Sequence, residues 1–140
     1  AVKAIANRRN ISIRFEMKQE SIRVLGDVGG LSQVFINLIN NAVKFSPDKN
    51  SVDIFTTCRG NEAVVSIADH GLGIPPDSIP HLFERFYRAK NVTVAEIPGT
   101  GIGLYIVKSI VDELNGAISV VSEVNRGTMF IVKLRLAEEN

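Results

Sequence analysis

Residues 31–44 read LSQVFINLINNAVK, and they decide how the rest of the chain is interpreted. Asp27 or Ser32 is available to cap the start of a helix here, and Ser46-Pro47 ends it because proline breaks a helix. Apolar side chains recur every three or four residues, the spacing of one helix face: Leu31, Val34, Phe35, Leu38, Ile39, Ala42 and Val43. The stretch therefore predicts a long amphipathic helix with one buried face.

The opposite face of this helix carries amides. Gln33, Asn37 and Asn41 are four residues apart, and Lys44 follows three residues later, so these side chains form one polar stripe. Asparagine favours a helix less than lysine or glutamate does, so the stripe needs a reason. Amide oxygens suit Mg²⁺, and a lysine one turn away suits the phosphates that share the ion. From this helix alone, a magnesium-phosphate site and an ordinary solvated face both stay open.

Strand patterns surround this helix. Ile22 and Val24 suggest one short strand, and alternating apolar residues predict longer ones at about 11–17, 52–58, 63–68, 117–122 and 128–136. Turn signals separate the second of these from the third and the fourth from the fifth: Arg59-Gly60-Asn61 and Asn125-Arg126-Gly127. The pattern indicates hairpins in a half-buried sheet.

A second long helix is predicted at about 101–114, and Asn115-Gly116 ends it. This helix is apolar nearly all round, so we expect it to be buried. From Asp69 to Gly101 the chain is rich in glycine and proline and predicts mostly loop, with a helix only at 79–89. The order of elements predicts an α/β (α+β) fold, a two-layer sandwich with the helices on one face of a mixed sheet and a long loop over one end.

The composition narrows the class of protein. With 140 residues, 45% of them hydrophobic, the chain can bury one core. Sixteen Lys and Arg balance 15 Asp and Glu for a net charge of +1, so no basic excess points to nucleic acid or to an anionic membrane. Cys58 is the only cysteine, which excludes an internal disulfide. No stretch can span a bilayer, so we expect a cytoplasmic domain, whether or not its parent protein is membrane-anchored.

Two glycine-containing motifs suit a nucleotide. Asp69-His70-Gly71-Leu72-Gly73-Ile74-Pro75 places a carboxylate at the end of a strand, where it can accept hydrogen bonds from an exocyclic amine; a surface turn is the plainer alternative. Gly99-Thr100-Gly101-Ile102-Gly103-Leu104 opens the second helix, where free N–H groups and the helix dipole favour a phosphate. No Gly-Lys-Ser/Thr follows, so the second motif is not a P-loop, and taken alone it could equally be a flexible loop.

Taken together, the motifs resemble those of sensor histidine kinases. Residues 33–42 are similar to their N box, 69–74 to the first glycine box, 81–88 to the phenylalanine box and 99–104 to the second glycine box. All four occur in the family's order, and Gly127-Thr128-x-Phe130 resembles its closing strand. The resemblance implies the catalytic ATP-binding domain of such a kinase, in the gyrase/chaperone/histidine-kinase/mismatch-repair superfamily. That domain transfers the γ-phosphoryl group of ATP to a histidine.

The resemblance also implies roles for single residues. Asn37 would hold Mg²⁺, Asn41 and Lys44 would contact the phosphates, and Arg88, with Arg85 as a weaker candidate, would stabilise the transferring group. Phe45, where relatives often have tyrosine, would pack on adenine, and Asp69 would accept a hydrogen bond from the exocyclic amine of adenine. Residues 99–104 would anchor a lid. The implied ATP site consists of Asn37, Asn41, Lys44, Phe45, Asp69, Gly71, Gly73, Ile74, Gly99, Thr100, Gly101, Gly103 and Leu104. His70 and Pro98 depart from the family's pattern.

The acceptor histidine is missing from this chain. Neither His70 nor His81 has the context of the family's acceptor, a histidine followed by an acidic residue and shortly by Arg and Pro. The resemblance therefore implies a separate helical dimerisation and phosphotransfer domain as partner, with a response regulator served indirectly. We expect residues 1–10 to end a connector from that domain, and residues 11–140 to form a monomeric catalytic domain.

Three rival functions are weighed against this one. Hydrolysing ATPases of the superfamily carry Glu four residues before the magnesium asparagine, and Gln33 cannot replace it as a base. A serine-phosphorylating anti-sigma-factor kinase lacks the phenylalanine box. A nucleotide-binding module without transfer activity is disfavoured because every expected type of ligand contact is present.

Overall fold

The computed structural model describes residues 11–17, 22–47, 50–91 and 101–137. Their strands form one five-stranded sheet in the order β1-β2-β3-β5-β4. Its members are β1 (Ser12–Met17), β2 (Ser51–Arg59), β3 (Glu62–Ala68), β4 (Ala117–Glu123) and β5 (Gly127–Arg135). β1 runs parallel to β2, and the other neighbours are antiparallel, which makes the sheet mixed as predicted.

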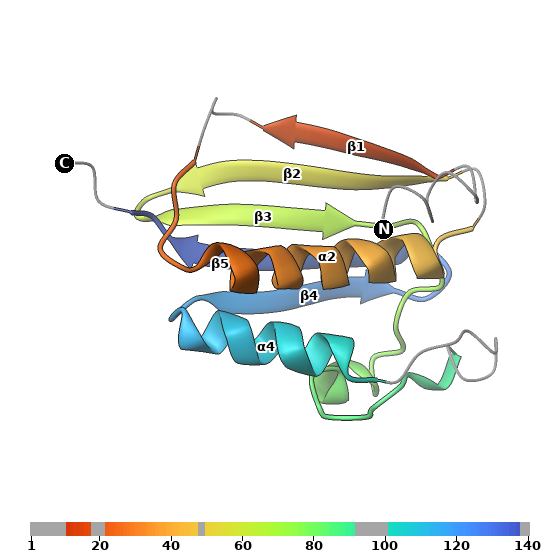
Figure 1. Cartoon of the computed structure of the whole chain (residues 1–140). Coiled ribbons are helices and arrows are strands. Elements are labelled where there is room, and N and C mark those ends of the chain that lie inside the picture. The colour runs from red at the N-terminus through yellow and green to blue at the C-terminus, as the bar shows by residue number, and fades with distance from the viewer. Residues whose placement is uncertain (1–10, 18–21, 48–49, 92–100, 138–140) are drawn as a thin grey trace.

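Two helices lie side by side on one face of this sheet, α2 (Val28–Phe45) and α4 (Gly103–Glu113), as Figure 1 shows. The core fills the space between the two layers. Its fully buried side chains come from both layers: Val34, Leu38, Val43, Val52, Ile67, Val107, Val111, Val132 and Leu134. The predicted two-layer sandwich is confirmed.

Helix α2 begins and ends where local chemistry sets its limits. Asp27 is the N-cap, and its Oδ1 accepts a hydrogen bond of 2.6 Å from the Gly30 N–H, which satisfies a donor that the helix leaves unpaired. Ser46 is the C-cap, and its hydroxyl donates to the Ala42 carbonyl at 2.7 Å. Ser32, the alternative cap, lies inside the helix.

Some local expectations were wrong. Ile22 and Val24 form no strand, and Val24 makes only a single bridge to Leu136. The segment 79–89 is not an α-helix but a 3₁₀ turn, η1 (Ile79–His81), followed by turns. Phe86 takes a left-handed φ of 67°, which breaks any helix.

The two other departures concern burial at the margins of the fold. Only Val107 and Val111 of α4 are fully enclosed, because this helix packs on α2 and β4 and keeps its outer side in contact with solvent. Phe15 is one of the alternating apolar residues that predicted a half-buried strand at 11–17, yet on the edge strand β1 it is 63% exposed.

Parts of the sequence-based prediction fall outside the described residues, namely the connector at 1–10 and residues 92–100 of the long loop. The domain limits stay a prediction. None of the helices that the structure describes is long and apolar enough to cross a membrane.

Candidate functional site

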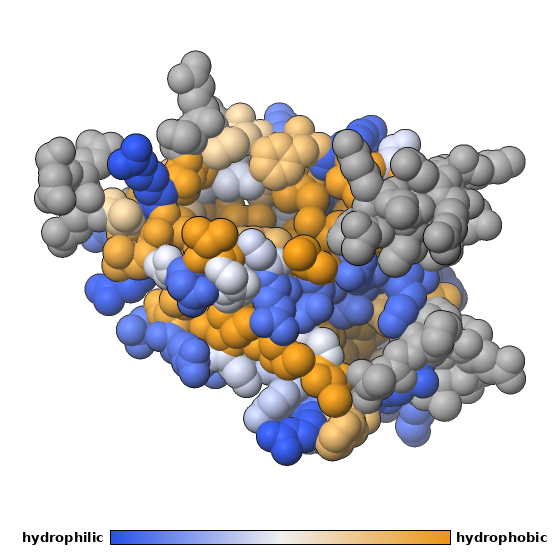
Figure 2. All heavy atoms as spheres, viewed as in Figure 1, coloured by the Kyte–Doolittle hydropathy of each residue, from blue (hydrophilic) through white to orange (hydrophobic). Residues whose placement is uncertain are grey.

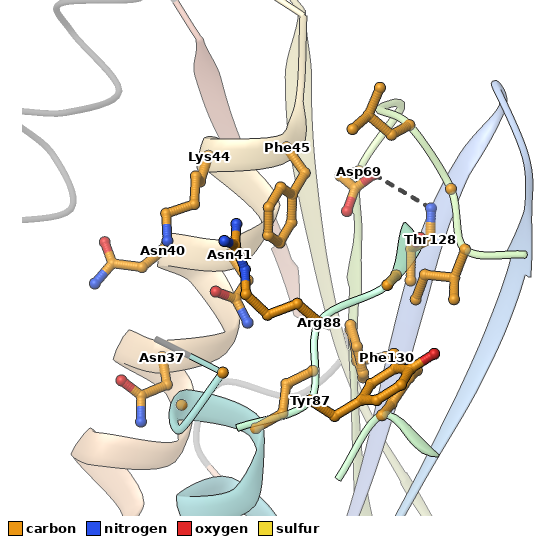
Figure 3. A pocket seen from close by; sticks show the side chains of 18 residues that line it. Asn37, Asn40, Asn41, Lys44, Phe45, Asp69, Tyr87, Arg88, Thr128 and Phe130 are labelled. Carbon is orange, nitrogen blue, oxygen red and sulfur yellow. Dashed lines mark hydrogen bonds between the residues drawn. The ribbon is translucent and has the colours of Figure 1, made fainter. Parts of the chain in front are cut away.

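A pocket of about 370 Å³ opens beside the polar stripe of α2, a volume that suits a small organic ligand. Its wall is completed by the segments that follow β3 and η1, by the start of α4 and by β5 (Figure 3). The lining residues are Asn37, Asn40, Asn41, Lys44, Phe45, Asp69, Leu72, Gly73, Ile74, Leu82, Tyr87, Arg88, Ala89, Gly101, Gly103, Leu104, Thr128 and Phe130. Figure 2 shows the surface of the molecule as viewed in Figure 1, where polar and apolar side chains alternate along α2.

One end of the pocket is organised around a buried carboxylate. Asp69 is 8% exposed, and its Oδ1 accepts hydrogen bonds from the Gly71 N–H at 2.9 Å and the Thr128 N–H at 3.2 Å. Burial raises the pKa of Asp69, although these two N–H groups oppose the rise. Both bonds use one oxygen, and Oδ2 has no hydrogen bond within the described residues. This second oxygen can accept a hydrogen bond from a ligand.

Glycines allow the backbone to close tightly around this carboxylate. A Cβ at Gly71 would overlap the Phe45 carbonyl, and one at Gly73 would overlap the backbone of Glu123. Gly73 also has a φ of 69°, which L-residues with side chains rarely adopt. The loop after β3 is therefore clamped between the end of α2 and the β4–β5 turn, and this clamp fixes the position of Asp69.

The other end of the pocket is formed by amides and cations. Asn37, Asn41 and Lys44 line it from α2, and Arg88 enters from the opposite wall (Figure 3). Burial, and then the charge of Arg88, lower the pKa of Lys44, so the two cations lie close enough to repel each other. Two facing cations beside neutral amide oxygens suit a polyanionic ligand.

The beginning of α4 borders the same end. Gly101 has a φ of 76°, and a Cβ there would press on the backbone of Phe86 and Tyr87. The first N–H groups of an α-helix have no partner within the helix, and the dipole makes this end positive. With Gly103 and Leu104 in the wall, the helix terminus adds to the positive character near Arg88.

The donor set can hold a magnesium ion only together with a ligand. The described residues contain no cluster of three or more His, Cys, Asp or Glu side chains that could bind a metal. The amide oxygens of Asn37 and Asn41 are too few for a complete shell, whereas Mg²⁺ is commonly held by one or two protein groups with phosphate oxygens and water completing the octahedron. The site thus fits a magnesium-phosphate complex.

The pocket brings together most of the residues predicted from sequence. Eleven of them line it: Asn37, Asn41, Lys44, Phe45, Asp69, Gly73, Ile74, Arg88, Gly101, Gly103 and Leu104. Gly71 lies behind Asp69 and shapes the wall without lining it. Gly99 and Thr100 lie outside the described residues. Arg85 does not line the pocket either, because its guanidinium donates a 2.8 Å hydrogen bond to the Tyr105 hydroxyl.

Gln33, on which the exclusion of a hydrolysing ATPase depends, lies on α2 outside the lining of the pocket. Its side chain is exposed, and the exclusion of hydrolysis drawn from it stays a prediction. Asp69 is the one acidic residue that lines the pocket among the described residues. Asp69 lies away from Asn37 and Lys44, across the pocket (Figure 3).

Sequence reasoning missed seven lining residues: Asn40, Leu72, Leu82, Tyr87, Ala89, Thr128 and Phe130. Thr128 and Phe130 belong to the closing-strand motif, but the motif did not assign them to the site. They alternate on β5 and face the core side of the sheet, so their place in the pocket follows from register. Asn40 carries a buried Oδ1 without a hydrogen-bond partner in the described part of the chain. The adjacent pair Asn40-Asn41 was a sequence signal that could have drawn attention to it.

Residues 26–138 match the sequence model of a family described as histidine kinase-, DNA gyrase B-, and HSP90-like ATPase. The chain belongs to this ATPase family. The ATPase domain is 38% identical over 128 residues to the sensor histidine kinase YkoH of Bacillus subtilis (strain 168). The match covers 91% of this chain but only 27% of YkoH.

Solved structures agree with this assignment. A mycobacterial sensor histidine kinase, MprB, superposes with a TM-score of 0.83 at 29% identity, covering 99% of this chain and 92% of that chain. Full-length ShkA, solved in complex with AMPPNP, gives a TM-score of 0.82 at 28% identity over 97% of this chain and 28% of that chain. The predicted family and fold are confirmed, and the ATPase domain corresponds to the catalytic part of sensor histidine kinases.

Proposed function

We propose that this ATPase domain binds Mg-ATP and transfers its γ-phosphoryl group to a histidine on a separate helical domain of the parent protein. The observation that carries the proposal is a single pocket that joins a buried carboxylate at one end to amides and facing cations at the other. An adenine at the first end and a triphosphate at the second would match both sets of groups.

At the first end, Asp69 would read the adenine through its exocyclic amine. Its Oδ1 is held by two backbone N–H groups, which leaves Oδ2 as the acceptor. Phe45 and Ile74 line the same pocket and offer apolar surface to the base. An amine is a better match than a carbonyl, because a carboxylate can only accept hydrogen bonds.

At the second end, Asn37 would coordinate Mg²⁺ while Asn41 and Lys44 contact the phosphates. Bound Mg²⁺ would neutralise charge on the phosphoryl oxygens. Lys44 and Arg88 would hold the triphosphate between them, and their mutual repulsion supports this because a polyanion relieves it. Phosphoryl transfer depends mainly on such positioning and charge stabilisation.

The pocket favours a phosphoryl acceptor other than water. Asp69, the acidic residue of the lining, belongs to the adenine end, so no described side chain at the amide end is suited to act as a general base. His70 and His81 are exposed, pair with Asp53 and Glu84, and line no part of the pocket. The acceptor would therefore come from another domain.

The match covers only a small part of YkoH and of full-length ShkA, which are much longer than the ATPase domain. The remaining length of these relatives supports a further domain as partner. The proposed partner is the dimerisation and histidine-phosphotransfer domain of the parent kinase. A response regulator would receive the phosphoryl group from that domain, without touching this one.

Isotope transfer tests the proposal. The isolated domain with Mg²⁺ and γ-labelled ATP should bind nucleotide, release phosphate very slowly and remain unlabelled. The helical domain of the parent, added in trans, should acquire a label that is labile in acid and stable in alkali. Rapid phosphate release without partner would indicate a hydrolase, nucleotide binding without any transfer would indicate a binding module, and label on His70 or His81 would contradict a separate acceptor.

A further inference from the structure

Three successive residues after η1 are tied to different parts of the fold. Arg85 donates a 2.8 Å hydrogen bond to the Tyr105 hydroxyl, and its guanidinium carbon lies 4.7 Å from the centre of the Tyr105 ring. The Phe86 N–H donates to the Gly101 carbonyl at 2.9 Å. The Tyr87 hydroxyl donates to the buried Ser78 hydroxyl at 2.8 Å.

The residue that follows these anchors is Arg88, which enters the pocket opposite Lys44 (Figure 3). Phe86 has a left-handed φ of 67°, and Gly101 approaches its backbone so closely that a Cβ would not fit. Such a backbone conformation costs free energy and persists only where neighbouring contacts hold it. The direction in which Arg88 projects therefore depends on the contacts made by residues 85–87.

We infer that Arg85 is a positioning residue, which clamps the loop to the Tyr105 side chain on α4 so that Arg88 is held at the phosphate end of the pocket. This inference rests on the proposed function, in which Arg88 contacts the phosphates. It replaces the expectation that Arg85 itself stabilises the transferring group, because the Arg85 guanidinium points to Tyr105 and lies outside the pocket.

The electrostatics of Tyr105 agree with this contact. The hydrogen bond and charge of Arg85 lower the pKa of the Tyr105 hydroxyl, as expected when a cation stabilises the phenolate. The contact combines a stacked guanidinium with a hydrogen bond, and lysine cannot reproduce this geometry. An exposed pair of this kind stabilises by a modest amount, so its effect on Arg88 should be measurable but limited.

Nucleotide binding separates positioning from direct contact. The quantity to measure in the isolated domain is the ratio of the dissociation constants of Mg-ADP and Mg-AMPPNP, which reports recognition of the third phosphate. Arg85→Ala and Tyr105→Ala should each reduce this ratio by about two- to fivefold, and Tyr105→Phe, which keeps the ring, should reduce it less. Arg126→Ala removes a distant exposed charge and should leave the ratio unchanged.

The same substitutions made in an Arg88→Ala background test the dependence on Arg88. If Arg85 acts through Arg88, Arg85→Ala will change nothing further once Arg88 is gone. A full effect of Arg85→Ala in that background would mean that Arg85 acts directly. An unchanged ratio in Tyr105→Ala would mean that the contact with Tyr105 does not position Arg88. Either result would overturn the inference.

Amide hydrogen exchange tests the inference even if the domain binds no nucleotide. Absence of nucleotide binding would overturn the proposed function but not the inference. Loss of the clamp should speed hydrogen exchange at the Phe86 N–H, whose acceptor is the Gly101 carbonyl. Exchange at this N–H that is equally slow in wild type and Tyr105→Ala would contradict positioning by Arg85, whatever the nucleotide result.

Discussion

The two ends of the pocket differ in whether backbone or side chains form them. The carboxylate end is made by backbone: Asp69 is held by two N–H groups, and the loop around it fits only because Gly71 and Gly73 have no side chain. The amide end is made by side chains that project from α2 and from the loop carrying Arg88. Substitutions at the carboxylate end should therefore affect folding as well as binding, whereas those at the amide end should affect binding alone.

The largest effect is expected at Gly73. Gly73→Ala has to accept a left-handed φ and an overlap with the Glu123 backbone, while Gly60→Ala accepts a similar φ of 62° in open space. We expect Gly60→Ala to lower the free energy of unfolding by about 1–2 kcal/mol and Gly73→Ala to lower it by a further ~1–3 kcal/mol. Denaturant unfolding measures both variants, and equal losses would contradict a clamped backbone at this end.

The next largest effect concerns the carboxylate itself. Asp69→Asn keeps an oxygen for the Gly71 and Thr128 N–H groups but turns an NH₂ group toward the proposed adenine amine. We expect ATP affinity to fall by ~1–3 kcal/mol, since two donors then face each other, with a smaller change in unfolding. Calorimetry measures the affinity, and unchanged binding would remove Asp69 from the site.

The pH dependence of Asp69 provides a second test of the same end. Burial raises the pKa of Asp69 above its ordinary value of 3.8, so in the range just above pH 3.8 the folded state binds more protons than the unfolded chain. The contribution of Asp69 to folding stability should therefore increase as pH falls through the raised pKa, while ATP affinity decreases because the carboxyl becomes protonated. Both trends should be absent from Asp69→Asn, and a wild-type profile identical to that of the variant would contradict them.

The two asparagines of the stripe distinguish a metal ligand from a phosphate contact. Asn37→Ala should abolish Mg²⁺-dependent transfer and weaken ATP by roughly 1–3 kcal/mol only when Mg²⁺ is present. Asn41→Ala should weaken ATP with and without the ion. Titrations in Mg²⁺ and in EDTA measure both, and the reverse pattern would assign the metal to Asn41. Unfolding of both variants should stay close to wild type if this end is made of side chains.

The smallest effect is a change in the pKa of Lys44. Burial is the larger cause of its lowered pKa and Arg88 the smaller one, so Arg88→Ala should raise the pKa only part of the way back to 10.5. An NMR titration of the lysine side chain in nucleotide-free protein measures the shift, with Arg126→Ala as the charge-matched control. A Lys44 pKa indifferent to Arg88 would mean that the two cations do not face each other.

Much of the fold could be predicted because its signals are local. The limits of α2 follow from the Asp27 cap and Ser46-Pro47, and the β2–β3 and β4–β5 hairpins follow from alternation and turn residues. The segment 79–89 was mistaken for a helix because its apolar residues have suitable spacing, whereas the hydrogen bond from Phe86 to Gly101 and the left-handed Phe86 come from contacts distant in sequence. The prediction that α4 is almost completely buried was wrong for a similar reason, because the residues of a helix do not determine how many layers of the fold cover it.

By itself, the sequence determined which side chains share the stripe on α2, where the carboxylate and glycines end β3, and that these motifs match one ATPase family. These features depend on spacing along one element, which the periodicity of a helix or strand fixes. Only the tertiary structure decided that Thr128, 59 residues away, fastens Asp69, that Gln33 lies outside the pocket, and that Arg85 turns to Tyr105 while Arg88 enters. Those outcomes depend on strand register and on close backbone approach between distant segments, which no local pattern encodes.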